Sequence, residues 1–266
     1  MLEHGGRLRA AAQQYGIPLN EWLDLSTGLA PWPFSFPAVP ASVWQRLPEA
    51  EDGLASVAAQ RYGAAQVLPV AGAQAAIQLL PQLRSAGSRV GIAAPCYAEH
   101  AHAWQRAGHQ LLELRDEAIE AALDELDVLL LVNPNNPTGR VFAPAQLLAW
   151  HARLAERGGW LVVDEAFIDA TPELSLAAHS HTPGLIVLRS FGKFYGLAGV
   201  RLGFVLAELG LLNDLNERLG PWAVSGPARW IGLACLADET AHQQQSLRLQ
   251  QASQRLADLL AEFGLV

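Results

Sequence analysis

Residues 190–201 hold a lysine in surroundings that are unusual for that side chain. The stretch reads SFGKFYGLAGVR, so Lys193 lies among aromatic and small residues, with three glycines nearby and Arg201 eight positions on. The chain has very few lysines, so one within an apolar stretch needs an explanation. A lysine amine attacks carbonyl carbons when a dry, crowded setting lowers its pKa. The same pattern also fits a loop lysine whose ammonium reaches water, so the other site residues must decide.

Further polar groups follow predicted strands or precede a predicted helix. The turn 133–139, of sequence NPNNPTG, follows one apolar run, Asp164 ends another, and Ser190 ends a third. The segment 72–74, of sequence GAQ, opens a helix whose free N–H groups and positive end suit a phosphate. Ligands bind beyond the carboxyl ends of the strands in open α/β sheets. We therefore expect these groups to meet Lys193 in one site.

A regular alternation of strand and helix patterns must position these groups. Short apolar or β-branched runs predict strands at residues 67–71, 90–94, 110–114, 128–132, 160–163, 185–188 and 201–207. The run 128–132 is continuously apolar, as expected of a strand that is buried on both faces. Helical patterns separate these runs. The sequence therefore predicts an α/β fold with three αβα layers and a mainly parallel sheet.

We divide the chain into three parts. Residues 1–48 form an N-terminal arm, rich in proline and tryptophan beyond residue 27, and residues 49–210 form a large domain. Residues 211–266 have helical patterns alone, including a long polar helix over 239–263. We interpret them as a linker and the beginning of a smaller C-terminal domain, and because no strand pattern follows residue 207, we expect that domain to be incomplete.

Composition excludes several classes of function. The formal charge of −8 argues against nucleic acid as a partner, because a phosphate backbone requires a basic surface. Cys96 and Cys235 lie far apart without metal-ligand spacing, so we expect neither a metal site nor a disulfide. No apolar run approaches the roughly 20 residues of a membrane span. No secretory signal pattern opens the chain, and we expect a cytoplasmic protein with no membrane partner.

The polar groups meet the needs of pyridoxal phosphate, and residues 65–207 resemble the fold-type I enzymes of the aspartate aminotransferase superfamily, which use that cofactor. The resemblance implies that Lys193 forms a Schiff base with the cofactor and that Asp164 pairs with its pyridinium. It also implies that Asn136 bonds the ring oxygen and that Tyr97 stacks on the ring. It assigns the cofactor phosphate to four further groups, the backbone of Ala73 and Gln74 and the side chains of Ser190 and Arg201.

Two subgroups of this superfamily fit best, the histidinol-phosphate aminotransferases and the threonine-phosphate decarboxylases of cobalamin biosynthesis. Phe167 stands where the aminotransferases usually have a tyrosine, so one hydrogen-bond donor to the ring oxygen is lost. His4 and the two glycines after it resemble the N-terminal His-Gly-Gly of the decarboxylases, whose histidine contacts the substrate phosphate. Segments 187–195 and 220–225 also resemble decarboxylase sequence. These features favour the second subgroup, with His4 as a substrate-binding residue.

The resemblance implies decarboxylation of L-threonine O-3-phosphate to 1-amino-2-propanol phosphate and carbon dioxide. In the implied reaction the substrate amine displaces Lys193 from the cofactor, and the freed lysine protonates Cα after carbon dioxide has left. The orientation of the Cα–carboxylate bond selects this outcome over transamination. We expect a homodimer, because sites of the family form at the subunit interface, and a small phosphorylated amino acid as the substrate.

Two other functions remain open. The first is histidinol-phosphate transamination on the same fold. The second is a truncated, non-catalytic protein that binds the cofactor, because the family's substrate-binding arginines lie in the C-terminal domain, beyond Val266.

Overall fold

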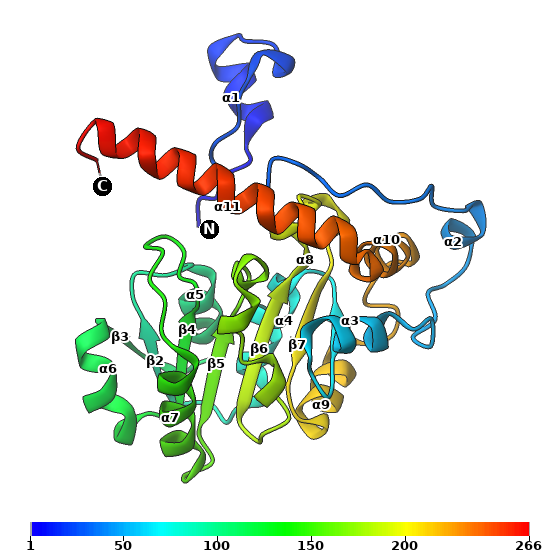
Figure 1. Ribbon diagram of the computed structural model, residues 1–266. Coiled ribbons are helices and arrows are strands. Elements are labelled where there is room, and N and C mark those ends of the chain that lie inside the picture. The colour runs from blue at the N-terminus through cyan, green and yellow to red at the C-terminus, as the bar shows by residue number, and fades with distance from the viewer. Residues whose placement is uncertain (1, 266) are drawn as a thin grey trace.

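A seven-stranded sheet forms the centre of the computed structural model, which describes residues 2–265 (Figure 1). Its strands are β1 (Leu68–Val70), β2 (Arg89–Ala93), β3 (Gln110–Leu114), β4 (Val128–Val132), β5 (Trp160–Asp164), β6 (Leu185–Ser190) and β7 (Gly203–Leu206). They lie in the order β1-β7-β6-β5-β4-β2-β3. The strands from β6 to β3 run parallel, whereas β7 is antiparallel to both β1 and β6. The predicted α/β fold with a mainly parallel sheet is confirmed.

The central strands are buried on both faces. Along β4, Val128 and Leu130 pack into the core on one face, and Leu129 and Leu131 pack into the core on the other. Side chains alternate between the faces of a strand, so a continuous apolar run serves both cores. Burial of each such side chain contributes roughly 1.5–3 kcal/mol.

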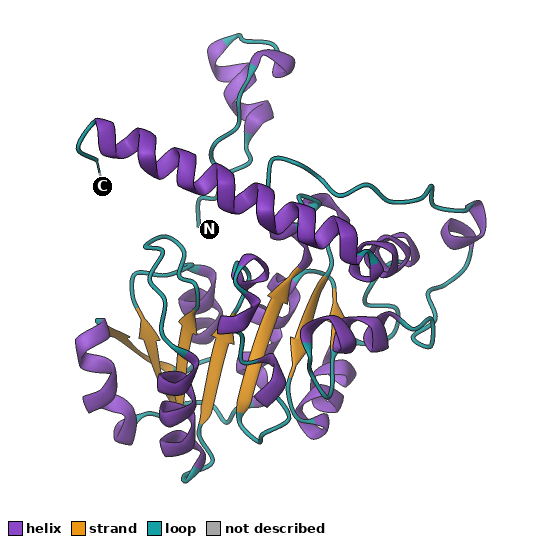
Figure 2. Ribbon diagram, in the orientation of Figure 1, coloured by secondary structure: helices purple, strands orange, loops and turns teal. Residues whose placement is uncertain are grey.

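Helices cover both faces of the sheet and complete three layers (Figure 2). The core that contains Leu129 is covered by α3 (Leu54–Tyr62), α6 (Asp116–Ala122), α7 (Pro144–Ala155) and α10 (Gly226–Ala237). The core that contains Leu130 is covered by α4 (Ala73–Leu79), α5 (Glu99–Arg106) and α9 (Leu209–Leu219). Short 3-10 helices lie at Leu19–Glu21, Leu80–Leu83, Leu123–Glu125, Ile168–Ala170, Pro172–Leu174, Ala177–His179 and Ala198–Val200.

Two further helices lie beyond the carboxyl ends of the strands. Helix α8 (Phe191–Phe194) follows β6 directly, and the long helix α11 (Glu239–Glu262) crosses above the central strands (Figure 1). The buried residues of α11 are His242 and Gln245 among those described. Gln245 donates from Nε2 to the carbonyls of Trp32, at 3.0 Å, and Phe194, at 2.8 Å. Helix α11 is thereby tied to both the N-terminal arm and α8.

The N-terminal arm makes few contacts with the sheet. Its helices are α1 (Leu8–Tyr15) and α2 (Ala41–Gln45), and neither has a buried residue within the described chain. Helix α1 stands away from the rest of the molecule (Figure 1). The division of the chain into arm, large domain and C-terminal segment stays a prediction.

Among residues 2–265, no helix has both the length and the apolar character that a membrane crossing requires.

Candidate active site

A cavity of about 160 Å³ lies beyond the ends of β4, β5 and β6. All eight residues that the sequence predicted for cofactor binding line it, namely Ala73, Gln74, Tyr97, Asn136, Asp164, Ser190, Lys193 and Arg201. Asp164 and Ser190 end two neighbouring parallel strands, so the topology of the sheet brings them together. His4, the ninth predicted site residue, does not line this cavity.

One end of the cavity is a cradle built around glycines. Gly72 caps α4 with a φ of 77°, and a Cβ there would lie 2.7 Å from Nη2 of Arg201. A Cβ on Gly203 would lie 2.5 Å from the backbone nitrogen of Ala73. Both glycines therefore allow the start of α4, Arg201 and β7 to approach closely. Ala73 and Gln74 open α4, where backbone N–H groups lack intrahelical partners, so with Arg201 and Ser190 they suit a phosphate.

Arg201 occupies strained backbone. Its φ of 57° lies in the left-handed region, which is uncommon for a residue with a side chain. Its Nη1 donates to the carbonyl of Ala198 at 3.1 Å, which helps to hold the guanidinium beside the cavity.

Asp164 also lines the cavity, with 3% of its surface exposed. Its Oδ1 accepts from the backbone nitrogen of Ala166 at 3.0 Å, and its Oδ2 lies 2.8 Å from Nε2 of His100, which is 1% exposed. In the tautomer that carries a proton on Nε2, His100 donates to the carboxylate and fixes its orientation. Sequence reasoning missed His100, which lies in the first turn of α5 with its ring centre 6.1 Å from that of Tyr97.

Lys193 is the only lysine in the 266-residue sequence. Burial lowers its pKa, and the nearby Arg201 lowers it further, while Asp164 acts in the opposite direction. Its Nζ lies 5.4 Å from the centre of the Phe167 ring. The amine is therefore neutral in a larger fraction of molecules than an exposed lysine would be, as a carbonyl-directed nucleophile requires.

The turn 133–139 presents Asn136 to the cavity. Asn133 exchanges two hydrogen bonds with the backbone of Phe142, and Asn135 donates to the carbonyl of Pro95 and to Oγ1 of Thr138. These hydrogen bonds fix the backbone of the turn, and they thereby fix the position of Asn136 at its middle.

A polar chain connects the N-terminal segment to the cavity. His4 Nε2 lies 2.7 Å from Glu99, Glu99 accepts from Nε2 of Gln74 at 2.8 Å, and Gln74 accepts from the Tyr97 hydroxyl at 3.2 Å. His4 thus lies beside the site, with its ring centre 6.1 Å from that of Tyr97. No sequence motif indicated Glu99, because its partners come from distant segments. The substrate-binding role of His4 stays a prediction.

A second and larger cavity of about 630 Å³ lies beside the first, and Lys193 and Phe167 line both. Its walls come from arm residues 28–31, from Phe167, Ala170 and Thr171, and from one side of α11. Lys193 is the sole charged residue that lines it among those described. The side chains of α11 that line this cavity are all neutral, namely Leu249, Gln250, Ser253, Gln254 and Ala257. Sequence reasoning did not place α11 there.

Comparison with known proteins agrees with this geometry. A profile of the family described as aminotransferase class I and II matches residues 43–266. The chain is 64% identical over 264 residues to the threonine-phosphate decarboxylase of Pseudomonas aeruginosa, an alignment that covers 99% of this chain and 80% of that protein. It is 30% identical over 238 residues to the histidinol-phosphate aminotransferase of Yersinia enterocolitica, covering 83% of this chain and 60% of that protein.

A solved structure is similar as well. The L-threonine-O-3-phosphate decarboxylase of Porphyromonas gingivalis matches with a TM-score of 0.71 at 25% identity, over 83% of this chain and 70% of that chain. These matches confirm the resemblance that the sequence motifs indicated.

Proposed function

The chain belongs to the aminotransferase class I and II family, and from that premise we propose that it is a pyridoxal-phosphate-dependent carboxy-lyase acting on L-threonine O-3-phosphate. Its high identity to a threonine-phosphate decarboxylase over nearly the whole chain is the observation that carries this proposal. The more distant aminotransferase relative makes histidinol-phosphate transamination the weaker alternative. The product, 1-amino-2-propanol phosphate, is the one that we expect cobalamin biosynthesis to use.

The residues around the smaller cavity fit the cofactor. When bound, pyridoxal phosphate supplies an electron sink for the pair released when a bond at Cα breaks. The cradle formed by Ala73, Gln74, Ser190 and Arg201 matches a phosphate in donor type and in the room that the glycines leave. Asp164, oriented by His100, offers a buried negative charge to a protonated ring nitrogen.

Lys193 has two tasks in the proposed reaction. Its neutral amine bonds the cofactor between turnovers, and its lowered pKa makes that amine available. Once the substrate has displaced it, the same Nζ holds the proton that is delivered to Cα after carbon dioxide has left. The ring of Phe167, whose centre lies 5.4 Å from Nζ, has no hydroxyl that could compete for this proton.

We also propose a homodimer in the cytoplasm, on the basis of the family resemblance. Exposed apolar side chains on the N-terminal arm support an association between subunits, since Leu23, Leu25 and Trp44 are 79%, 81% and 68% exposed. Side chains of this size on a protein surface often mark an interface.

A comparison of two substrates tests the proposed function. The cofactor-loaded protein is incubated with L-threonine O-3-phosphate alone and, separately, with histidinol phosphate and 2-oxoglutarate. We expect carbon dioxide in the first reaction and no glutamate in the second. Glutamate formation without carbon dioxide release would identify an aminotransferase. A cofactor absorbance that neither substrate perturbs would identify a non-catalytic cofactor-binding protein.

A further inference from the structure

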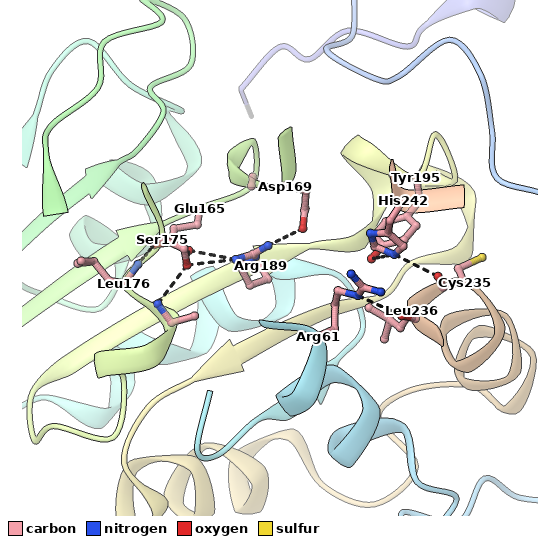
Figure 3. A network of polar contacts seen from close by, with 12 residues as sticks. Arg61, Glu165, Asp169, Ser175, Leu176, Arg189, Tyr195, Cys235, Leu236 and His242 are labelled. Carbon is pink, nitrogen blue, oxygen red and sulfur yellow. Dashed lines mark hydrogen bonds and ion pairs between the residues drawn. The ribbon is translucent and has the colours of Figure 1, made fainter. Parts of the chain in front are cut away.

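A buried ionic cluster lies next to the strand ends that carry the site, outside both cavities (Figure 3). Arg189 donates from Nη1 to Glu165 at 3.2 Å and from Nη2 to Asp169. The side chains of Arg189, Glu165 and Asp169 are 3%, 0% and 6% exposed. Glu165 also accepts from the Ser175 hydroxyl at 2.6 Å and from the backbone nitrogen of Leu176 at 2.7 Å. The proposed reaction uses none of these charges.

The cluster is joined to the site through the backbone. Arg189 precedes Ser190 at the end of β6, and Glu165 follows Asp164 at the end of β5. Successive side chains along a strand point to opposite faces, so the ion pair and the site residues occupy opposite faces of the same two strand ends. The backbone nitrogen of Glu165 donates to the carbonyl of Leu188 at 2.9 Å, which extends the pairing of these strands by one bond.

Asp169 connects the cluster to the wall of the larger cavity. It lies in the 3-10 helix Ile168–Ala170, and the residues that flank this helix, Phe167 and Thr171, both line that cavity. Nζ of Lys193 lies 5.4 Å from the centre of the Phe167 ring, and a Cβ on Gly28 would lie 3.2 Å from Cε1 of the same ring. The bond between Arg189 and Asp169 therefore ties the segment that carries Phe167 to the strand that leads to Lys193.

Burial makes this cluster costly unless its charges stay paired. Burial by itself lowers the pKa of Arg189, but Asp169 and Glu165 outweigh it and raise that pKa. Burial raises the pKa of Glu165, while Arg189 and the Ser175 hydroxyl oppose the change. The Arg189 guanidinium also lies 4.2 Å above the ring of Tyr62. A buried ion cluster is weak evidence for stability, because apolar residues in its place often give an equally stable protein. We therefore interpret this cluster as a means of fixing the positions of its members.

We infer that Arg189 is a positioning residue for the reaction and that it acts through Asp169 to hold Phe167 against Lys193. The inference rests on the proposed function. Phe167 forms part of the wall of both cavities beside Lys193, so its place limits how the substrate can turn about Cα. When the wall loosens, the substrate reaches orientations in which a bond other than Cα–carboxylate breaks, and the reaction becomes both slower and less selective.

Asp169→Asn is the primary test, because it removes one charge and leaves Arg189 paired with Glu165. Two quantities are measured with L-threonine O-3-phosphate: kcat, and the ratio of carbon dioxide released to bound cofactor converted to its amine form. We expect kcat to fall about tenfold or more and the ratio to fall with it. A loss of folded protein would reduce both products equally and leave the ratio unchanged.

Asp52→Asn provides a matched control. Asp52 and Arg229 form a two-bond ion pair, at 2.6 and 2.7 Å, that is partly buried and lines neither cavity of the site. We expect this variant to lose stability while keeping the wild-type product ratio, with kcat within twofold per folded molecule. An equal change of ratio in both variants would overturn the inference, as would a wild-type ratio in Asp169→Asn.

Arg189→Lys carries the test if Asp169→Asn does not fold. A lysine keeps the buried positive charge but cannot donate in the forked geometry that reaches both carboxylates, so we expect the product ratio to change in the same direction. A further measurement needs no variant and no cofactor: hydrogen exchange of residues 166–172 in the wild-type protein. Protection close to that of β5 supports the inference, and exchange as fast as in the exposed arm contradicts it.

Discussion

The proposed capture of the cofactor by Lys193 should depend on pH, because the surroundings of this lysine lower the pKa of its amine. Burial lowers its pKa below the 10.5 of an ordinary lysine, so the neutral amine appears at lower pH. We expect the rate at which cofactor-free protein bonds pyridoxal phosphate to rise with pH, with a midpoint below 10.5. The bond is trapped with borohydride and measured as added mass. Because the sequence has only one lysine, Lys193→Ala should show no trapped cofactor on any lysine side chain.

A midpoint at or above 10.5 would show that the lysine is exposed to water in solution. Added mass of the same amount in Lys193→Ala would contradict the assignment of the cofactor bond to this residue.

His100 acts on the site through Asp164. Its replacement by phenylalanine leaves Oδ2 of a buried carboxylate without its partner, and such a loss costs about 1–3 kcal/mol. We expect His100→Phe to weaken pyridoxal phosphate binding roughly tenfold, measured by titration of cofactor-free protein. His109→Phe is the control, because it removes another buried histidine bond, to the carbonyl of Pro81, away from both cavities. Equal affinities in the two variants would show that Asp164 needs no partner.

At the scale of elements, the approach of α4 to β7 depends on Gly203. A Cβ at this position would lie 2.5 Å from the nitrogen of Ala73, so backbone must move. We expect Gly203→Ala to displace the start of α4 and to weaken cofactor binding about tenfold or more, measured by the same titration. Gly210→Ala, in the first turn of α9 with open space around it, should bind the cofactor normally. Normal binding by Gly203→Ala would mean that the cradle does not hold the phosphate.

Helix α11 is held against Tyr195 and the end of α10 through His242, a buried histidine of lowered pKa. His242 Nε2 lies 3.2 Å from both the Tyr195 hydroxyl and the carbonyl of Cys235. Burial lowers the pKa of His242, as does Arg61, while Asp169, the Cys235 carbonyl and Glu239 act in the opposite direction. The unfolded chain therefore binds this proton more readily. The stability that neutral His242 contributes is present above about pH 6.5 and is lost as the pH falls below that value.

We accordingly expect the free energy of unfolding to fall between pH 7.5 and pH 5, and His242→Asn to show a smaller fall. Denaturant titrations at both pH values measure the difference. His151, whose pKa burial also lowers, is present in both proteins and cancels in the comparison. Identical pH dependences in the two proteins would show that His242 is solvated or protonated without cost.

At the scale of the whole molecule, the sequence predicted the features that depend on local sequence pattern, above all the strands of the sheet. All seven strands lie where apolar runs indicated them, because a strand such as β4 is recognisable from five consecutive buried side chains. Asp164, Ser190 and the segment 72–74 could be placed in one site because they lie at strand ends or at a helix start, which sheet topology brings together, whereas Tyr97 and Arg201 were predicted from the family resemblance. Local pattern sufficed for the strands, and the site also needed the family resemblance.

Contacts between distant segments could not be predicted in this way. The bonds between His100 and Asp164 and between His4 and Glu99 join residues 64 and 95 positions apart. The buried cluster around Arg189 combines three segments, none with a distinctive motif. The position of α11 over Lys193 depends on Gln245, a polar residue that resembles many others on that helix. These features depend on how the layers pack, which periodicity does not encode.

The central claim is that this chain removes the carboxylate of a phosphorylated amino acid by means of Lys193. The most direct test is to supply the cofactor-loaded protein with L-threonine O-3-phosphate that carries an isotopic label in its carboxylate, and to measure labelled carbon dioxide. We expect continuous release by the wild-type protein and none by Lys193→Ala under the same conditions. A wild-type protein that binds cofactor at Lys193 but releases no labelled carbon dioxide would contradict the account.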